Sequence, residues 1–222
     1  MDSAVKIRSK NELIDFLSER KKRRKRELIA LVKEMSGRNA TSFRRRAAVV
    51  FAYAHWEGFV KDAASAYVQF VSQKSRRLSD LVVSFQALAC RQELTAAKEA
   101  RHRISHHIVL VQRLTDRINE SCQITANGAV DTESNLTAAV FENICASIGV
   151  DYSSKWATHG PFINDLFMNR CAIAHGELFE PDDSYAVEVI DFALQAIDRF
   201  SNEIEDAAVQ ELFLRPTPNI SM

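Results

Sequence analysis

The sequence predicts an all-α fold, and three observations support this class. The chain has 222 residues but only six glycines and four prolines, so long stretches lack helix breakers. Apolar residues recur at helical spacing along most of the chain, and no alternating strand pattern persists. With 46% hydrophobic residues, the chain is long enough to bury one core.

Cysteine usage and the apolar runs indicate a cytoplasmic protein without a membrane partner. The first ten residues lack the apolar segment of a signal peptide, and the longest apolar run, residues 47–54, is far too short to span a bilayer. The cysteines show no CxxC spacing, so we expect them to be reduced. They are Cys90, Cys122, Cys145 and Cys171.

The net charge of zero hides a strong asymmetry between the two ends of the chain. Residues 1–46 contain 15 Lys/Arg and 6 Asp/Glu, whereas residues 176–222 contain 2 Lys/Arg and 11 Asp/Glu. The two ends could pair with each other, within one chain or between two, and the basic end could also bind a polyanion.

A basic helix is predicted over about residues 9–37. Ser9 and Glu12 have the spacing of a capping box, and Gly37 marks the expected end. The middle of this helix is a run of seven cations, which is typical of a solvated helix face. It also suits an electrostatic track for an RNA or DNA backbone. The run consists of Arg20, Lys21, Lys22, Arg23, Arg24, Lys25 and Arg26.

A long helix is predicted next, over about residues 41–75. Its start is basic, and one apolar seam then advances in steps of three and four residues. A second apolar face suggests burial on at least two sides. The basic residues are Arg44, Arg45 and Arg46, the seam is Val49, Tyr53, Trp56, Val60, Ala63, Tyr67 and Phe70, and the second face is Ala47, Val50, Phe51 and Ala54.

Two polar residues, His55 and Glu57, lie inside this apolar stretch. Glu57 is either a satisfied carboxylate on the helix surface or a carboxylate that reaches Arg170 or orients His175. The alternatives differ in whether the long helix contributes to a site or only to the core.

Residues 78–120 are predicted to be helical and more polar. His102 and His106 have the spacing of a metal-binding pair, but neighbouring arginines oppose a cation and no third ligand is suggested nearby. We therefore expect no metal site, and favour a solvated or RNA-facing polar surface here.

Loops and a short helix precede residue 160. A loop over residues 121–131 turns at Asn127-Gly128, and a helix follows over about residues 134–148, ended by Gly149. Residues 150–160 are expected to be irregular, with Trp156 as an anchor.

The segment from Gly160 to Gly176 is the helix around which the rest appears organised. Pro161 suits its first turn and Gly176 suits the position just past its end. Arg170 falls on the apolar stripe of this helix and needs a partner. His175 ends the helix, and histidine is the residue type whose reference pKa, near ~6.5, suits proton transfer at neutral pH.

A last long helix is expected after a loop over residues 177–183. Asp182 or Asp183 caps it. Its apolar seam consists of Ala186, Ile190, Ala193, Ile197, Phe200 and Ile204.

Two stretches together resemble the HEPN superfamily (higher eukaryotes and prokaryotes nucleotide-binding). They are residues 54–63, in which tryptophan and glutamate are adjacent as in the MAE-type prokaryotic branch, and the motif Arg170-x4-His175 followed by Gly176. The resemblance covers roughly residues 40–210. The position after the arginine is often Asn, Asp or His in this family and is Cys171 here, while Asn169 precedes the arginine.

The resemblance implies an up-and-down bundle of about four or five helices. Together with the patterns above, it leads us to expect a long basic N-terminal helix at 1–38, the bundle at 39–214 and a frayed tail at 215–222. It implies a homodimer that brings two Rx4H motifs into one cleft. It also implies a metal-independent and cofactor-free endoribonuclease, commonly a toxin or an antiviral effector, with RNA as substrate and an antitoxin or defence-system protein as a further partner.

Carried over to this chain, the resemblance makes Arg170 and His175 the catalytic pair, with Glu57, Asn169 and His55 in support. Five residues along a helix correspond to about 140° of rotation, so the two side chains do not share one face. A second subunit could complete the site. Two alternatives stay open: a non-catalytic helical dimer that binds RNA or a protein, and a structural role in which Arg170 pairs with Glu57 while His175 caps the helix carbonyls.

Overall fold

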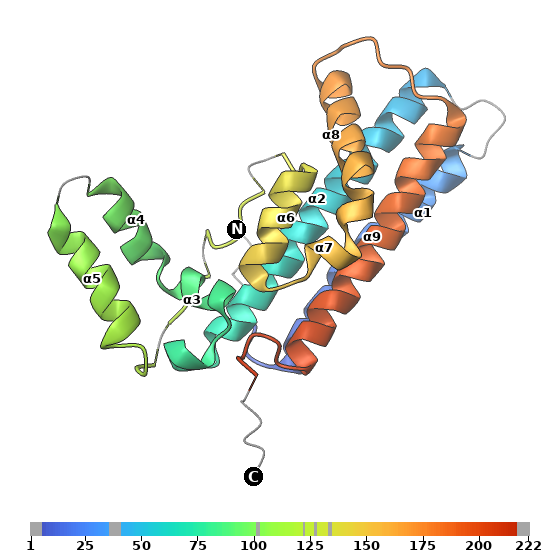
Figure 1. Cartoon of the computed structure of the whole chain (residues 1–222). Helices are drawn as coiled ribbons and strands as arrows, with labels where there is room; N and C mark the ends of the chain where they lie inside the picture. The colour runs from blue at the N-terminus through green and yellow to red at the C-terminus, as the bar shows by residue number, and fades with distance from the viewer. Residues whose placement is uncertain are drawn as a thin grey trace.

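A computed structural model describes residues 6–35, 41–100, 103–121, 123–126, 128–132 and 135–216 of this chain. In these ranges the chain forms α-helices and two short 3₁₀ helices, with isolated bridges and no β-strand, which confirms the all-α class (Figure 1). The expectations about Gly37, Cys122, Asn127 and the end of the tail fall outside the described residues.

Three long helices form the centre of the bundle. They are α1 (Lys10–Met35), α2 (Ser42–Ser72) and α9 (Asp183–Val209), and each packs against the other two along much of its length (Figure 1). The basic N-terminal helix thus lies directly against the helix that carries the predicted seam.

Side-chain caps at the N-termini of these three helices explain where each helix begins. Ser9 and Glu12 bond reciprocally: the Ser9 hydroxyl accepts from the Glu12 N–H at 3.1 Å, and Glu12 accepts from the Ser9 N–H at 3.1 Å. Thr41 caps α2 by accepting from the Arg44 N–H, and Asp182 caps α9 by accepting from the Tyr185 N–H at 2.7 Å.

The predicted seam of α2 is the spine of the core. Every residue of it is buried, and so is the predicted seam of α9 that faces it. The two sets meet at an aromatic cluster in which the Trp56 ring stacks on that of Trp156 and meets those of Phe141 and Phe200 edge to face.

The expectation that α2 is buried on at least two sides is confirmed, because it packs against α1, α6, α8 and α9, but two residues of its second apolar face are not covered. Ala54 is exposed and Phe51 is 48% exposed, because α1 packs on one flank of this face and α8 on the other without covering its middle. A band of apolar surface therefore remains open on α2.

Three short elements directly precede α8. The helix expected from residue 134 begins later, as α6 (Ala138–Ile148), and Gly149 ends it in the left-handed conformation at φ 73°. Residues 150–160 are more regular than expected, with α7 (Tyr152–Lys155) and η2 (Ala157–His159) before α8 (Gly160–Ala174). Trp156 is the anchor that the sequence predicted, since it is buried and donates to Glu203 at 2.8 Å.

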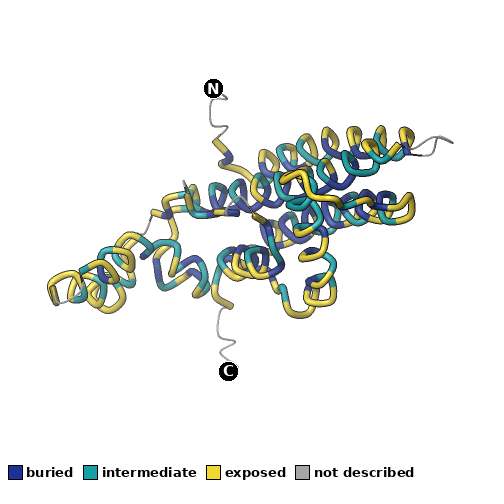
Figure 2. The backbone as a smooth tube through the Cα atoms, turned by 90° about the horizontal axis from the view of Figure 1, so that it is seen from above, coloured by how far each residue is buried: buried dark blue, intermediate teal, exposed yellow. Residues whose placement is uncertain are grey.

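The polar stretch from residue 78 onward divides into η1 (Leu78–Asp80), α3 (Val83–Ala89), α4 (Arg91–Glu99) and α5 (Ile104–Thr115). The pair α4–α5 forms a hairpin that projects from the bundle (Figure 1). Figure 2 shows the hairpin coloured mostly as exposed, in contrast to the buried interior of the bundle.

Within the described residues, each helix is either too short or too polar to cross a lipid bilayer.

Candidate active site and basic surface

The helix that carries Arg170 and His175 has the boundaries that the sequence predicts. Pro161 lies in its first turn, where no intrahelical partner is lost. At the other end His175 is the C-cap, and Gly176 adopts φ 77°. The Gly176 N–H donates to Ile173 at 3.1 Å and the Glu177 N–H to Ala172 at 2.9 Å, which are the two bonds of a Schellman motif.

Arg170 turns from α8 toward α2, where it finds a charge partner. Its Nη2 lies 3.6 Å from Glu57 Oε2, so Glu57 does reach Arg170. The guanidinium carbon is 4.3 Å from the centre of the Tyr53 ring and 5.9 Å from that of Phe167. A carboxylate and an aromatic face therefore fix the arginine in one orientation.

Tyr53 is the member of this cluster that sequence reasoning missed as a site residue. Its hydroxyl accepts a hydrogen bond from the Leu136 N–H at 2.6 Å. Burial, and then the charge of Glu57, raise the pKa of Tyr53 to about 12, so it stays neutral at physiological pH. The signal was available, because Tyr53 and Glu57 are four residues apart on one helix and share a flank.

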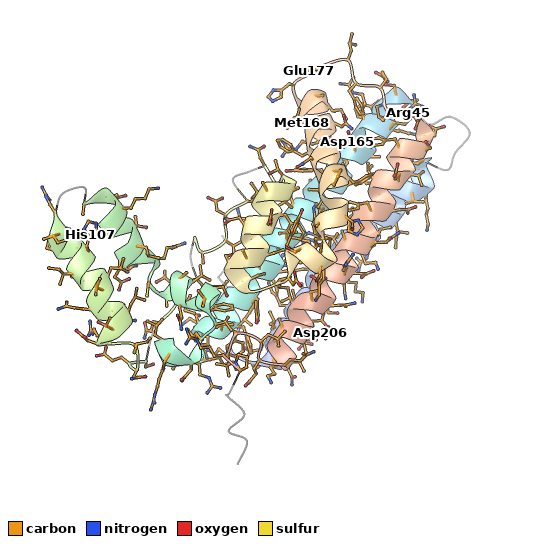
Figure 3. The ribbon with its side chains drawn as sticks, in the orientation of Figure 1. Arg45, His107, Asp165, Met168, Glu177 and Asp206 are labelled. Carbon is orange, nitrogen blue, oxygen red and sulfur yellow. The ribbon has the colours of Figure 1, made fainter. Side chains whose placement is uncertain are left out.

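His175 lies in a different setting, exposed at the end of α8. The segment that follows it is held against the start of α2, since Arg46 donates to the Glu177 carbonyl at 3.3 Å and lies 3.7 Å from Glu180. Figure 3 shows Glu177 and Met168 at this end of the molecule, with Arg45 nearby on α2.

Large apolar side chains are exposed on the elements next to His175. Leu178 is 97% exposed, Phe43 79% and Met168 62%. These side chains come from the loop after α8, the start of α2 and α8 itself. We call them, together with Phe51 further along α2, the apical apolar surface; exposed apolar side chains of this kind often mark association sites.

The structure places the two other supporting candidates away from Arg170. The Asn169 amide donates to the Tyr185 hydroxyl of α9 at 2.7 Å and to Asp165 at 3.1 Å, so it joins α8 to α9. His55 lies on the flank of α2 that faces α1, where its Nε2 is 3.2 Å from Glu27. Asn169 is one residue from Arg170 and His55 is two residues from Glu57, which correspond to about 100° and 200° of helical rotation, so each of these side chains faces another element.

The run of seven cations on α1 is split between the interior and the surface. Arg24 is buried and its Nη2 lies 2.8 Å from Asp62 of α2, with Arg20 at 3.8 Å from the same carboxylate. Lys21 and Lys25 both reach Asp198 of α9. The three remaining members of the run, Lys22, Arg23 and Arg26, are exposed.

Gly58 makes room for the buried arginine. A Cβ at this position would come within 2.9 Å of Arg24 Nη2. The glycine between Glu57 and Phe59 is thus explained by the close approach of α1 rather than by a turn.

The cations at the start of α2 also have intramolecular partners. Arg44 lies 3.8 Å from Glu34 of α1, and Arg45 lies 3.2 Å from Asp183 at the start of α9. The Arg45–Asp183 and Arg46–Glu180 pairs show that the basic and acidic ends meet within one chain, which was one of the two arrangements expected.

Metal ligands are not assembled in the part of the chain that the structure describes: it holds no group of three or more His, Cys, Asp or Glu side chains arranged for an ion. His106 is exposed on α5 and His102 lies outside the described residues.

Comparison with known proteins gives one match. The family model described as RiboL-PSP-HEPN matches residues 19–206, which includes α2, the Arg170–His175 helix and most of α1 and α9. The match begins earlier than the residue 40 at which the resemblance was expected to start. No curated protein and no solved structure matches the chain at a significant level.

Proposed function

This chain belongs to the RiboL-PSP-HEPN family of the HEPN superfamily, and from that premise we propose that it is a metal-independent endoribonuclease that acts as a toxin or an antiviral defence effector. The superfamily is the one that the two motifs predicted, while the matched branch is RiboL-PSP-HEPN instead of the MAE type.

One observation carries the proposal: an oriented arginine and an accessible histidine lie on the last two turns of α8. Arg170 is held by Glu57 and Tyr53 but keeps 21% of its side chain exposed. His175 is exposed at the end of the same helix, where a Schellman turn fixes the backbone. A substrate phosphate can thus reach both residues from solvent.

These two residue types suffice for RNA cleavage. His175 takes the proton of a 2′-hydroxyl, whose oxygen attacks the adjacent phosphorus and expels the 5′-oxygen of the next nucleotide. Arg170 donates to the non-bridging phosphate oxygens, on which negative charge grows in the transition state. The leaving oxygen takes a proton from a second acid, and the products are a 2′,3′-cyclic phosphate and a 5′-hydroxyl.

A second copy of the chain supplies that acid in this proposal. One subunit offers a single histidine at the end of α8, and general acid–base cleavage uses one group as base and another as acid. The apical apolar surface includes Met168 and Leu178, which flank this histidine along the chain. Pairing of two such surfaces about a two-fold axis brings the histidines of the two subunits to one phosphate.

The test of the activity is cleavage of single-stranded RNA in excess chelator, beside DNA of the same sequence. We expect RNA fragments that end in 2′,3′-cyclic phosphate and no cleavage of DNA. His175→Ala and Arg170→Ala should each lower the rate by about 100-fold or more, while His106→Ala, which alters an exposed histidine on α5, should not. An unchanged rate in His175→Ala would remove this residue from the mechanism.

The test of the dimer links mass to activity. Phe51→Glu and Met168→Glu should lower the mass measured by light scattering and the cleavage rate together, because both depend on the apical apolar surface. Val83→Glu is a matched control, since Val83 is 70% exposed on α3, far from that surface. A monomer that cleaves at the full rate would contradict the composite site.

A second candidate function, a non-catalytic module that binds RNA or a protein, is favoured by the Arg170–Glu57 pair itself. An arginine that already has a carboxylate partner can serve packing alone. Under this alternative, the wild-type chain binds RNA without cleaving it. Arg170→Ala then lowers the unfolding free energy and has no effect on cleavage.

A further inference from the structure

We propose that the α4–α5 hairpin of one copy of this chain docks into the acidic groove along α9 of a second copy. The hairpin (residues 91–115) and the groove lie on different parts of the molecule (Figure 1). The contact is thus made between chains, and it is independent of the ribonuclease proposal.

The hairpin is an apolar surface without a cover in one chain. α5, which the structure describes in full, has no buried residue and packs on α4. Ile104, Ile108 and Val111 are 67%, 49% and 56% exposed. Their spacing of four and three residues places them on one face of α5, as in an amphipathic helix whose apolar face packs against another element.

The charge of the hairpin narrows the choice of partner. Residues 91–115 contain five Lys/Arg and two Asp/Glu, so two hairpins packed on each other would bring like charges together. The same residues include no Phe, Tyr or Trp, so the apolar face offers no rings for base stacking and does not suit RNA. An acidic protein surface with an apolar floor is the complement.

The same chain carries such a surface. An open groove between the start of α8 and the solvent side of α9 is floored by Phe162, Val187 and Phe192. Glu188 and Asp191 line its rim and are exposed. Two cations contact lining residues of the groove: Arg199 lies 3.0 Å from His159 and pairs with Glu203 at 3.4 Å, and Arg45 pairs with Asp183 at 3.2 Å. Both arginines thus already have carboxylate partners within the chain.

The two surfaces match in pattern as well as charge. The groove's rim residues Ser184, Glu188, Asp191 and Gln195 repeat at steps of four and three along α9, as the apolar stripe does along α5. Lys98 and Arg103 are exposed beside that stripe, at the end of α4 and the start of α5. Docking places these cations against the carboxylates and the aliphatic side chains against the aromatic floor.

The test uses two variants, each of which damages one surface and leaves the other intact. The hairpin variant is Ile104→Glu/Ile108→Glu, and the groove variant is Glu188→Lys/Asp191→Lys. All four residues are exposed, so the fold should persist, and the circular-dichroism spectrum and melting temperature check this. Self-association is measured by sedimentation over a range of concentrations, and every chain compared, the reference chain included, also carries Phe51→Glu and Met168→Glu so that the apical apolar surface does not contribute.

We expect each variant alone to associate at least about tenfold more weakly than the reference chain. An equimolar mixture of the two variants should associate again, because the intact hairpin of one docks in the intact groove of the other. Val83→Glu and Asp206→Lys, matched exposed substitutions outside the two surfaces, should have no effect.

Two results would overturn the proposal. If the hairpin variant associates as the reference chain does, the hairpin makes no contact between copies. If both variants are weakened but their mixture is not restored, the contact is not hairpin to groove. RNA cleavage is scored separately, in the wild-type chain, so loss of the ribonuclease proposal would leave this result intact.

Discussion

At the scale of single residues, Arg24 shows how one side chain in a basic run can belong to the core. We expect Arg24→Ala to lower the unfolding free energy by about 2–3 kcal/mol, because the substitution removes buried packing and leaves Asp62 with only the more distant Arg20. Arg23→Ala, which alters the exposed neighbour, should change it by less than about 0.5 kcal/mol. Urea unfolding of both variants measures the difference, and equal effects would contradict the buried pair.

A second residue, His55, makes the stability of the fold depend on pH. Burial lowers the pKa of His55 below its ordinary value, with Arg24 and Arg23 adding to the shift and Glu27 opposing it. The unfolded chain then binds the proton more readily than the folded one, so stability is full above about pH 6.5 and falls as the pH drops below that value.

The corresponding prediction concerns the slope of that fall. His55→Gln, which stays neutral, should flatten the decline of unfolding free energy between pH 6.5 and the lower folded-state pKa. His106→Gln, at an exposed histidine, should leave the decline as it is. Urea titrations at several pH values provide the measurement, and identical slopes in His55→Gln and wild type would show that His55 does not control it.

The residue scale also shows what the sequence could and could not reveal. The burial of Arg24 could have been predicted from the sequence. Leu17, Arg24 and Leu28 are spaced by seven and four residues, and all three are buried on one face of α1. The direction in which His55 points could not have been predicted. The sequence places His55 on a flank of α2, but it does not show whether α1 or α8 packs against that flank. Glu57 and Arg170 come from segments more than 100 residues apart, so their pairing was an alternative rather than a derivation.

At the scale of elements, the end of α8 depends on one glycine. Gly176 has φ 77°, and a Cβ there would meet nothing within 4 Å, so the cost of substitution is conformational and not steric. We expect Gly176→Ala to lower the unfolding free energy by about 1 kcal/mol and Gly176→Asn by less, because asparagine tolerates the left-handed region. Under the proposed function, cleavage should follow the same order, since this turn positions His175. A Gly176→Ala variant as stable and active as Gly176→Asn would refute this role of the turn.

Elements with a continuous apolar seam were the predictable ones. The seams of α2 and α9 are long, and their capping residues are polar side chains at the expected spacing, so both helices were located to within a few residues. The division of residues 78–120 into four pieces was missed, because α4 and α5 are short and the apolar residues of α5 face solvent instead of the core. Hydrophobic periodicity indicates a helix but does not identify what covers it.

At the scale of the whole molecule, the basic and acidic ends of the sequence pair with each other in the folded chain. Cations of α1 and the start of α2 meet carboxylates of α9 and the loop before it, as in the pairs of Lys25 with Asp198 and of Arg45 with Asp183. This use of charge leaves a smaller basic surface than the sequence suggests. A stripe of α1 with Lys22, Arg26 and Lys33 around the exposed Ile29 is what remains open.

The last prediction concerns RNA binding by that surface, as part of the proposed function. If Lys22, Arg26 and Lys33 contact phosphates, replacing all three by glutamine should weaken binding of single-stranded RNA and reduce the slope of log affinity against log salt by about 2, because each such contact contributes roughly 0.7 to the slope. A control with the same charge change, Lys98→Gln/Arg103→Gln/Lys155→Gln, alters exposed cations spread over other elements and should leave the slope nearly unchanged. Equal slopes in both triple variants would mean that net charge alone attracts the RNA. If the RNA instead follows this stripe, only removal of the cations in the stripe reduces the number of counterions that the RNA releases on binding.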